Sequence, residues 1–283
     1  MKRLIVWSWG SLIFLGICAC LLFAIVWGEP DGNRHPNVGA IVYRVLGDTQ
    51  VYPGASGALI SDRVFLTAGH VTKALESMIS AGMTTLANIF ICFDSTDTLL
   101  PGANLRPIDS IITHPHYSLP GKDNSWDIGL IFLKDAVTDI TPAQLPPFPN
   151  FLDELKASGE LVSNPRKGTK FVCVGYGSFL EFPPPIIVWE NKDRYMAESG
   201  FLGFNKYWLF MSQNLHTGNG GTGYGDSGGP NFWKNDDGTE TIVALTSQGD
   251  VRLVATNIAY RVDTEGSLAF IQGALSSVSS LTK

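Results

Sequence analysis

Three residues of types that can act together as a catalyst stand in distinctive local sequences. Ser227 lies in GTGYGDSGGP, which holds five glycines in ten residues, His70 ends LTAGH, and Asp127 begins DIGLIFL. A serine hydroxyl can be activated by a neighbouring histidine, and a carboxylate can orient that histidine. Each residue alone has a simpler explanation: a structural histidine, an aspartate that turns the chain, or a serine in a flexible loop. Together they favour nucleophilic catalysis.

The composition predicts a folded chain of the all-β class. The 283 residues are 45% hydrophobic and 16% charged, enough for one large or two medium domains with a real core. Thirty glycines and sixteen prolines, spread without a repeat, indicate many turns between short strands. The net charge of -6 and the lack of a Lys/Arg cluster argue against a nucleic-acid partner. No phosphate-loop or metal-ligand spacing occurs, so no cofactor or metal is expected.

Strand-like segments divide into two groups along the chain. They are short, rich in β-branched and aromatic residues, and bounded by Gly, Pro, Asp or Asn, at 38–45, 56–69, 87–94, 108–114, 127–133, 170–177, 240–247 and 258–262. The stretch that contains Trp189, Trp208 and Phe210 is expected to be an insertion with aromatic core residues. Only one helix is expected, near the end, where helical spacing is kept by Leu268, Ile271, Leu275 and Val278.

The amino terminus has the form of an export signal. Lys2 and Arg3 precede an uncharged apolar run over residues 4–27. This run exceeds the roughly 7–15 residues of a signal-peptide core and reaches the ~20 needed to span a bilayer. Residues 1–24 are therefore expected to be a signal peptide or a signal anchor, and both alternatives stay open. The expected location is extracellular, with anchorage in a membrane as the alternative.

Cysteine usage predicts a fold that depends on its core. Of the four cysteines, Cys18 and Cys20 fall in the amino-terminal run, which leaves Cys92 and Cys173 for the folded part. At most one disulfide is then available, so burial of apolar surface must stabilise the protein. Each of the two lies in an apolar strand-like run, which favours a buried free thiol.

LTAGH, DIGLIFL and GDSGGP, in this order, resemble the three catalytic motifs of the chymotrypsin/trypsin family of serine proteases. The first two depart slightly from the usual TAAHC and DIALL, whereas GDSGGP matches the nucleophile motif outright. The resemblance extends from about Ile25 to the terminal helix, which is nearly all of the chain after the amino-terminal run. With few cysteines, the chain resembles the low-cysteine microbial members of the family in particular.

The resemblance implies an all-β fold of two six-stranded antiparallel β-barrels with a C-terminal α-helix. The expected parts are a first barrel at 25–145, a connection at 146–164, and a second barrel with the terminal helix at 165–283. The active site would lie in the cleft between the barrels, with His70 and Asp127 from the first and Ser227 from the second.

The resemblance also implies hydrolysis of polypeptide substrates through an acyl-enzyme. Ser227 would attack the acyl carbonyl, His70 would take its proton and later donate it to the leaving group, and Asp127 would hold the imidazole tautomer. The backbone N–H groups of Gly225 and Ser227 would bind the oxyanion, and a glycine at 225 keeps a side chain out of the way. Gly228 and Gly229 would allow close packing behind the nucleophile.

The same resemblance gives Asp226 a partner at the start of the mature chain. IVWGEPDGNRHPNVGAI, from Ile25, resembles the family's mature start, usually IVGG, whose free amino terminus pairs with this aspartate. Ala24 precedes Ile25 where a Lys or Arg would mark activation by a protease. Our hypothesis is that cleavage on export frees Ile25 and so activates the enzyme. The alternative is that Ile25 to Trp27 only end a membrane anchor.

The expected specificity pocket carries no charge. Trypsin-like members have an acid six residues before the nucleophile, where this chain has Gly221, so specificity for basic side chains is not supported. Gln248 replaces the usual tryptophan, and Asn257 is expected deeper in the pocket. A small or apolar substrate side chain is expected between walls formed by Gly221, Thr222, Ser247 and Gly249.

Other departures leave alternatives open. Val71 and Gly223 stand where the family usually has cysteines, so the familiar disulfides are absent. His114 and His116 are expected to be surface turn residues. A catalytically silent homologue that acts as an extracellular binding module, a membrane-anchored protease and an esterase using the same triad remain as alternatives to a secreted endopeptidase.

Overall fold

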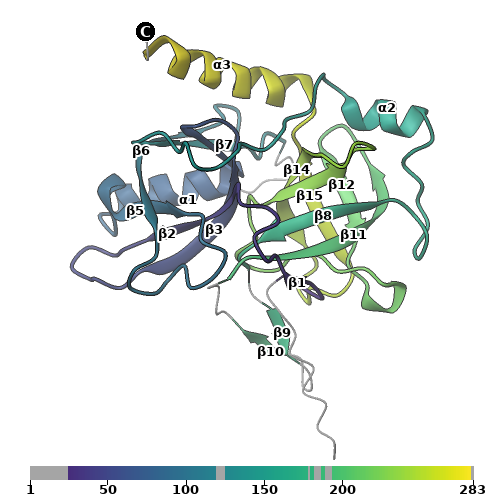
Figure 1. Cartoon of the computed structure of the whole chain (residues 1–283), viewed down its shortest axis with the longest axis horizontal. Helices are drawn as coiled ribbons and strands as arrows, with labels where there is room; N and C mark the ends of the chain where they lie inside the picture. The colour runs from purple at the N-terminus through teal and green to yellow at the C-terminus, as the bar shows by residue number, and fades with distance from the viewer. Residues whose placement is uncertain (1–24, 119–124, 178, 182–185, 189–192, 282–283) are drawn as a thin grey trace, which may run out of the picture.

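The body of the molecule consists of two closed antiparallel β-barrels (Figure 1). The structure is a computed structural model that describes residues 25–118, 125–177, 179–181, 186–188 and 193–281. The expected signal segment, residues 1–24, and Trp189 lie outside the described residues. The prediction of two six-stranded barrels followed by a helix is confirmed.

The first barrel closes in the order β2-β3-β4-β7-β6-β5. Apolar runs of the sequence form its strands because strands that are covered on both faces need apolar side chains on both. All residues of β4 and β7 are buried in this way. The strands are β2 (Val38–Tyr43), β3 (Tyr52–Leu59), β4 (Val64–Thr67), β5 (Ile89–Cys92), β6 (Leu105–Thr113) and β7 (Gly129–Leu133).

The second barrel closes because β8 pairs with both β13 and β11. Its strands are β8 (Lys170–Gly175), β11 (Tyr195–Phe204), β12 (Trp208–Ser212), β13 (Pro230–Lys234), β14 (Glu240–Gly249) and β15 (Thr256–Arg261). The short β1 (Glu29–Pro30) adds to β11, and β9 (Phe179–Glu181) pairs with β10 (Ile186–Val188).

The expectation of an insertion before the nucleophile motif is wrong for β11 and β12, which are barrel strands. In β11 the buried Ala197, Ser199 and Phe201 alternate with the exposed Glu198 and Leu202, as in a strand with one face on a core. Two glycines and a serine within this strand give it a composition that is typical of loops, and they conceal the alternation.

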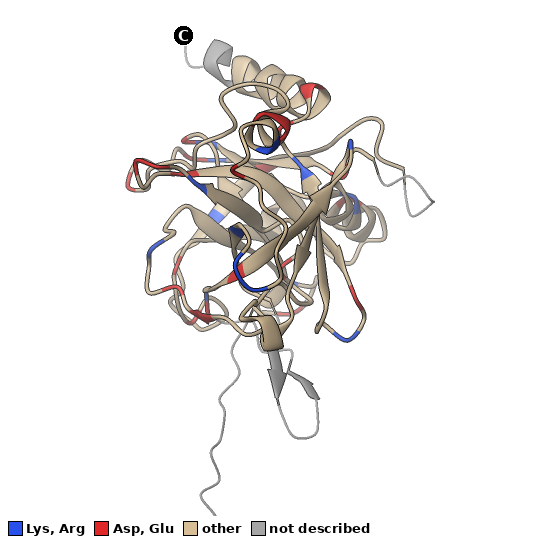
Figure 2. Cartoon of the chain, turned by 90° about the vertical axis from the view of Figure 1, so that its right-hand side faces the viewer, with Lys and Arg blue, Asp and Glu red and all other residues tan. Residues whose placement is uncertain are grey.

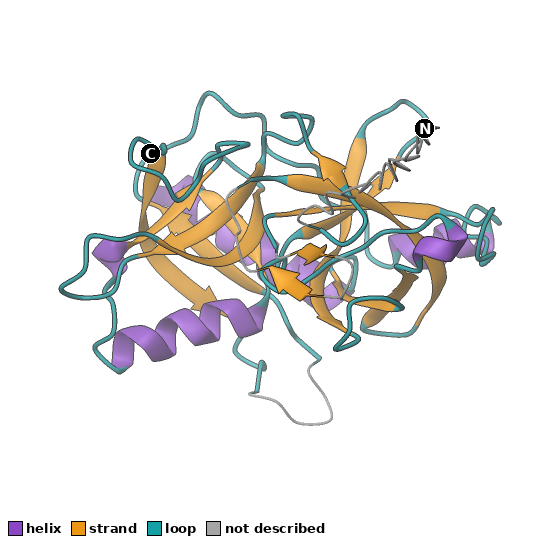
Figure 3. Ribbon diagram, turned by 90° about the horizontal axis from the view of Figure 1, so that it is seen from below, coloured by secondary structure: helices purple, strands orange, loops and turns teal. Residues whose placement is uncertain are grey.

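A helix begins within the first motif, LTAGH, contrary to the expectation of a single helix. This helix, α1 (Gly69–Ser80), buries Val71 and Leu75, and Ile79 continues the same helical face onto the first barrel's core. The connection between the barrels contains a further short helix, α2 (Phe151–Ala157). The strands form two groups with the helices outside the sheets (Figure 3).

The expected terminal helix is present as α3 (Glu265–Leu281). It follows the second barrel but packs on the first, because the Phe270 ring lies 4.8 Å from that of His114. His114 is buried and stacks on Trp126 at 4.6 Å, so its assignment to a surface turn is wrong. Burial lowers the pKa of His114 to about 4, so this ring is neutral at physiological pH. None of the helices within the described residues is long and apolar enough to cross a membrane.

Direct packing joins the barrels, without disulfides among the described residues. One cluster of buried side chains includes Leu66 from the first barrel and Val174 and Tyr260 from the second. Cys92 and Cys173 are both buried free thiols, as the sequence indicates. Basic and acidic positions are interspersed over the side of the molecule drawn in Figure 2.

Candidate active site

Asp127 holds the imidazole of His70 in one orientation. His70 is the second residue of α1, and Asp127 lies two residues before β7. The Nδ1 atom of His70 lies 2.9 Å from Asp127 Oδ2, and the His70 backbone N–H donates to Oδ1 at 2.7 Å. Because a carboxylate only accepts, the ring proton sits on Nδ1, and Nε2 is left as an acceptor. Asp127 is 1% exposed and His70 30%, so only the histidine meets solvent.

Ser247 supports the same carboxylate. Its hydroxyl donates to Asp127 Oδ2, a contact that the sequence did not predict, since Ser247 was expected only as a pocket wall. Gly69 is required by close packing, because a Cβ atom there would meet the backbone nitrogen of Ile128 at 2.9 Å. These contacts fix the carboxylate and the start of α1 against each other.

Ser227 comes from the second barrel to the same cavity as His70. Both residues line a cavity of about 240 Å³, whose other walls include Val71 and Leu75 from α1 and Ala55 from β3. The backbone N–H of a β3 residue donates to the Ser227 carbonyl at 2.9 Å and so joins the two barrels at this point. The structure therefore brings the three predicted catalytic residues together at the junction of the barrels.

The residues 223–229, here called the nucleophile loop, leave two N–H groups available beside Ser227. The N–H of Asp226 donates to Gly223 O at 3.2 Å, and the N–H of Gly228 donates within the barrel to a β14 carbonyl at 2.8 Å. Within the part of the chain that the structure describes, the N–H groups of Gly225 and Ser227 donate no hydrogen bond. These two are the predicted oxyanion donors.

Glycine is required at two positions of the nucleophile loop by backbone conformation. Gly225 has φ +96° and Gly228 has φ +78°, values that residues with a Cβ atom rarely adopt. A Cβ atom at Gly228 would also collide with the Thr67 hydroxyl, and one at Gly229 would lie 2.6 Å from the Val174 carbonyl. The close packing expected behind the nucleophile is present.

Asp226, a member of the nucleophile loop, has a fully buried side chain. Its carboxylate accepts hydrogen bonds from the N–H groups of Gly177 at 2.7 Å and Gly223 at 2.8 Å. No basic side chain among the described residues forms an ion pair with it. Burial raises the pKa of Asp226 to about 7, although the two N–H groups oppose that shift.

Ile25, the predicted partner of Asp226, is also buried. Its side chain belongs to the apolar cluster of the second barrel, and Val26 forms a β-bridge with Gly221. In this chain Ile25 is an internal residue, so its nitrogen is a neutral peptide group. A cationic nitrogen at Ile25 would need cleavage of the chain before this residue.

In the uncleaved chain, the free energy of unfolding is expected to fall as the pH rises from about 4 to about 7. The folded chain keeps the Asp226 proton, which the unfolded chain releases near the ordinary value of 3.8, and so the folded state loses this advantage as the pH rises through the raised pKa. Urea denaturation at pH 5 and pH 7 measures the change, and Asp226→Asn, which cannot titrate, should make it smaller. Equal changes in both proteins would contradict the raised pKa.

A second cavity of about 140 Å³ begins at Ser227 and matches the expected specificity pocket in part. Thr222, Ser247 and Gly249 line it, as expected. Gly221 does not take the expected place in its wall, because an added Cβ atom there would meet the side chain of Gln213 instead. Gly221 is thus a packing position behind the cavity.

Two further polar residues bear on this cavity. Asn257 is fully buried and does not line the cavity itself; it accepts a hydrogen bond from the hydroxyl of the lining residue Thr222 at 2.9 Å. Asp250 also lines the cavity, although only uncharged residues were expected there. Its carboxylate accepts the backbone N–H groups of Arg252, Val254, Ala255 and Thr256, which outweigh its partial burial and lower its pKa.

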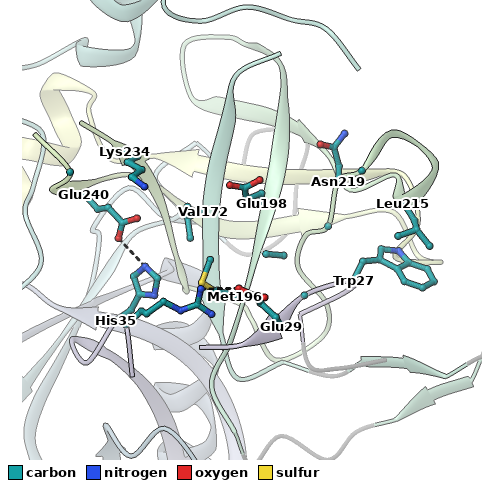
Figure 4. A pocket seen from close by; sticks show the side chains of 16 residues that line it. Trp27, Glu29, His35, Val172, Met196, Glu198, Leu215, Asn219, Lys234 and Glu240 are labelled. Atoms are coloured by element: carbon teal, nitrogen blue, oxygen red, sulfur yellow. Dashed lines mark hydrogen bonds and ion pairs between the residues drawn. The ribbon is translucent and has the colours of Figure 1, made fainter. Parts of the chain in front are cut away.

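A larger cavity, of about 770 Å³, contains none of the three predicted catalytic residues among its lining residues. It lies between the amino-terminal segment with Trp27 and His35 and the strands of the second barrel (Figure 4). Its three carboxylates, Glu29, Glu198 and Glu240, each lie within 3.1 Å of a basic group of the same chain. Each of these carboxylates is therefore paired within the chain, and Lys234 also lines the cavity.

No group of three or more His, Cys, Asp or Glu side chains in the described ranges is arranged to hold a metal ion.

Residues 32–264 of the chain match the family model described as Trypsin. The match includes His70, Asp127 and Ser227, and both barrels fall within it.

Proposed function

The chain belongs to the trypsin family, and from that premise we propose that it is a serine endopeptidase that hydrolyses peptide bonds through an acyl-enzyme. The observation that carries this proposal is the junction between the barrels, where His70, oriented by Asp127, lines the same cavity as Ser227. A nucleophile, a base and an orienting carboxylate are the parts that acyl transfer needs.

In the proposed mechanism, the Ser227 hydroxyl attacks the carbonyl carbon of the substrate as its proton passes to His70 Nε2. Asp127 keeps the other ring proton on Nδ1 and stabilises the imidazolium that forms. The imidazolium then donates its proton to the leaving amine, and the C–N bond breaks. Water, deprotonated by His70, hydrolyses the acyl-enzyme and restores the free hydroxyl.

The negative oxygen of the tetrahedral intermediate would be bound by the N–H groups of Gly225 and Ser227. Their lack of an acceptor within the described chain supports this role, because donors held ready cost no reorganisation when the charge develops. An ester substrate would use the same steps.

Covalent labelling with a fluorophosphonate probe tests the proposed function. Peptide mapping by mass spectrometry should place the adduct on Ser227 in the folded protein, and heat-denatured protein should remain unlabelled. An adduct elsewhere, or no adduct in folded protein, would overturn the enzyme proposal and favour the catalytically silent binding module.

We propose a small or apolar residue on the acyl side of the cleaved bond. The 140 Å³ cavity is lined by Thr222, whose hydroxyl donates to the buried Asn257, and the Asp250 carboxylate already accepts four backbone N–H groups. Profiling with a peptide library should therefore give cleavage after small or apolar residues at least about tenfold over Lys or Arg, since one extra or missing methylene in a hydrophobic pocket already changes kcat/KM by about 10–200-fold. Cleavage after Lys or Arg that disappears in Asp250→Asn would instead identify Asp250 as the residue that selects the substrate.

We further propose that the protein is exported and that cleavage between Ala24 and Ile25 frees the activating amino terminus. The buried positions of Ile25 and Asp226 are compatible with pairing after such a cleavage, because an ammonium group would compensate the buried carboxylate. The intact mass of the exported protein tests this: a chain that begins at Ile25 supports it. Any other amino terminus would overturn it, and a retained amino-terminal segment in membrane fractions would indicate an anchored protease.

A further inference from the structure

A buried serine of the first barrel contacts the nucleophile loop of the second. Ser56, in β3, is fully buried, and its hydroxyl donates to the Gly225 carbonyl at 3.1 Å. In the same peptide group, the N–H of Asp226 donates to Gly223 O at 3.2 Å. The plane of the Gly225–Asp226 peptide is therefore held at both its carbonyl and its N–H.

The Ser227–Gly228 peptide group is held in the same way. The Ser56 backbone N–H donates to the Ser227 carbonyl at 2.9 Å, and the N–H of Gly228 donates to Thr246 O at 2.8 Å. The two held peptide groups alternate with the two that carry the N–H groups of Gly225 and Ser227. A single residue of the first barrel thus contacts both the Gly225 carbonyl and the carbonyl of Ser227 itself.

The Ser56 hydroxyl is itself fixed from the other side. It accepts the backbone N–H of Tyr176 at 3.0 Å. The Tyr176 phenol donates to the Asp94 carbonyl at 2.8 Å and accepts from the buried Arg194 guanidinium at 2.9 Å. Arg194 in turn forms a fully buried ion pair with Asp31 at 2.9 Å. The hydroxyl therefore has one available orientation, with its proton toward the nucleophile loop.

Such support matters because the glycines of the nucleophile loop restrict its backbone little by themselves. Four of its seven residues are glycines, which lose more conformational freedom on folding than any other residue. We propose that the Ser56 hydroxyl is a positioning group that orients the Gly225–Asp226 peptide and thereby aims the N–H groups of Gly225 and Ser227 at the oxyanion. This inference rests on the proposed function and names a residue that the three catalytic motifs do not contain.

The test is Ser56→Ala, measured per active site. Active sites are counted by fluorophosphonate titration, so that unfolded molecules do not contribute to kcat. We expect kcat for a peptide amide to fall about tenfold with KM changed less than about twofold, because the donors remain but lose their aim. Affinity for a peptide boronic acid, whose tetrahedral adduct needs the same donors, should fall by the same factor.

Ser267→Ala is the matched control. Ser267 is equally buried and also donates to a backbone carbonyl, that of Arg261 at 3.1 Å, but it lies in α3. This variant should lower the melting temperature without changing kcat per active site. Ser56→Cys, which keeps a weak S–H donor, should give a kcat between those of Ser56→Ala and the wild type.

The outcomes separate the two proposals. Wild-type protein that takes no fluorophosphonate would overturn the proposed function. Wild-type protein that is labelled, together with Ser56→Ala whose kcat per active site is unchanged, would overturn the positioning role alone. A fall in melting temperature without a fall in kcat would likewise assign Ser56 to stability only.

Discussion

Ser227→Ala is expected to lower kcat for a peptide amide by about 10⁶-fold, to the rate that binding and the oxyanion donors sustain without a nucleophile. His70→Ala should cause a loss of the same order, because the hydroxyl of Ser227 is a weak nucleophile until a base takes its proton. The double variant should be no slower than either single one, since the two groups act in one step. Steady-state hydrolysis of a chromogenic peptide amide by purified protein measures all three.

His216→Ala is a matched control for the histidine substitution. His216 is exposed in the short helix Leu215–Thr217 and lines neither of the two cavities that contain Ser227, so its removal should leave kcat unchanged. Losses that multiply in the double variant would mean that Ser227 and His70 contribute independently. That result would contradict the shared step on which the proposed mechanism depends.

The meeting of the three motif residues could be predicted from the sequence, because the proposed chemistry requires particular side chains. Each motif places its residue in a recognisable setting: a serine among glycines, a histidine after a strand, and an aspartate before a buried strand. The structure brings His70, Asp127 and Ser227 together. The two barrels could be predicted for the same reason, through the family that the motifs indicate.

The supporting contacts could not be predicted, because they are made by groups that every residue has or by residues far apart in the chain. Gly177 contacts Asp226 through a backbone N–H, which leaves no mark on the side-chain pattern. Ser247 contacts Asp127 from another barrel, and Ser56 contacts Gly225 across 169 positions of sequence. Only the register of the folded strands decides which hydroxyl faces which partner.

Local composition misled the prediction in two places. The helix α1 begins at Gly69, one residue before His70. The strand-like residues before His70 favoured a strand there, and the helical spacing of Val71 and Leu75 is too short a pattern to predict a helix by itself. His114 lies in a Pro-containing segment typical of a turn, yet tertiary packing against Trp126 and Phe270 buries it. In both places contacts with distant residues outweigh the local preference.

Gly225→Ala is expected to lower kcat per active site by about 10²–10³-fold, with a smaller effect on KM. An alanine at φ +96° carries backbone strain of about 1–3 kcal/mol, and relief of that strain would rotate the Gly225 N–H away from the oxyanion. Loss of one oxyanion donor costs about this factor in kcat because the donor acts mainly in the transition state. Active-site titration, followed by kcat and KM for a peptide amide, measures the effect.

Gly47→Ala separates strain from catalysis. Gly47 has a similar φ of +85° in an exposed turn, and a Cβ atom there would have no neighbour within 4 Å. Both variants should therefore lose a comparable amount of stability in urea denaturation, and only Gly225→Ala should lose kcat. If Gly225→Ala kept its kcat while losing stability, its glycine would serve the turn alone, and the oxyanion donors would have to be sought elsewhere around Ser227.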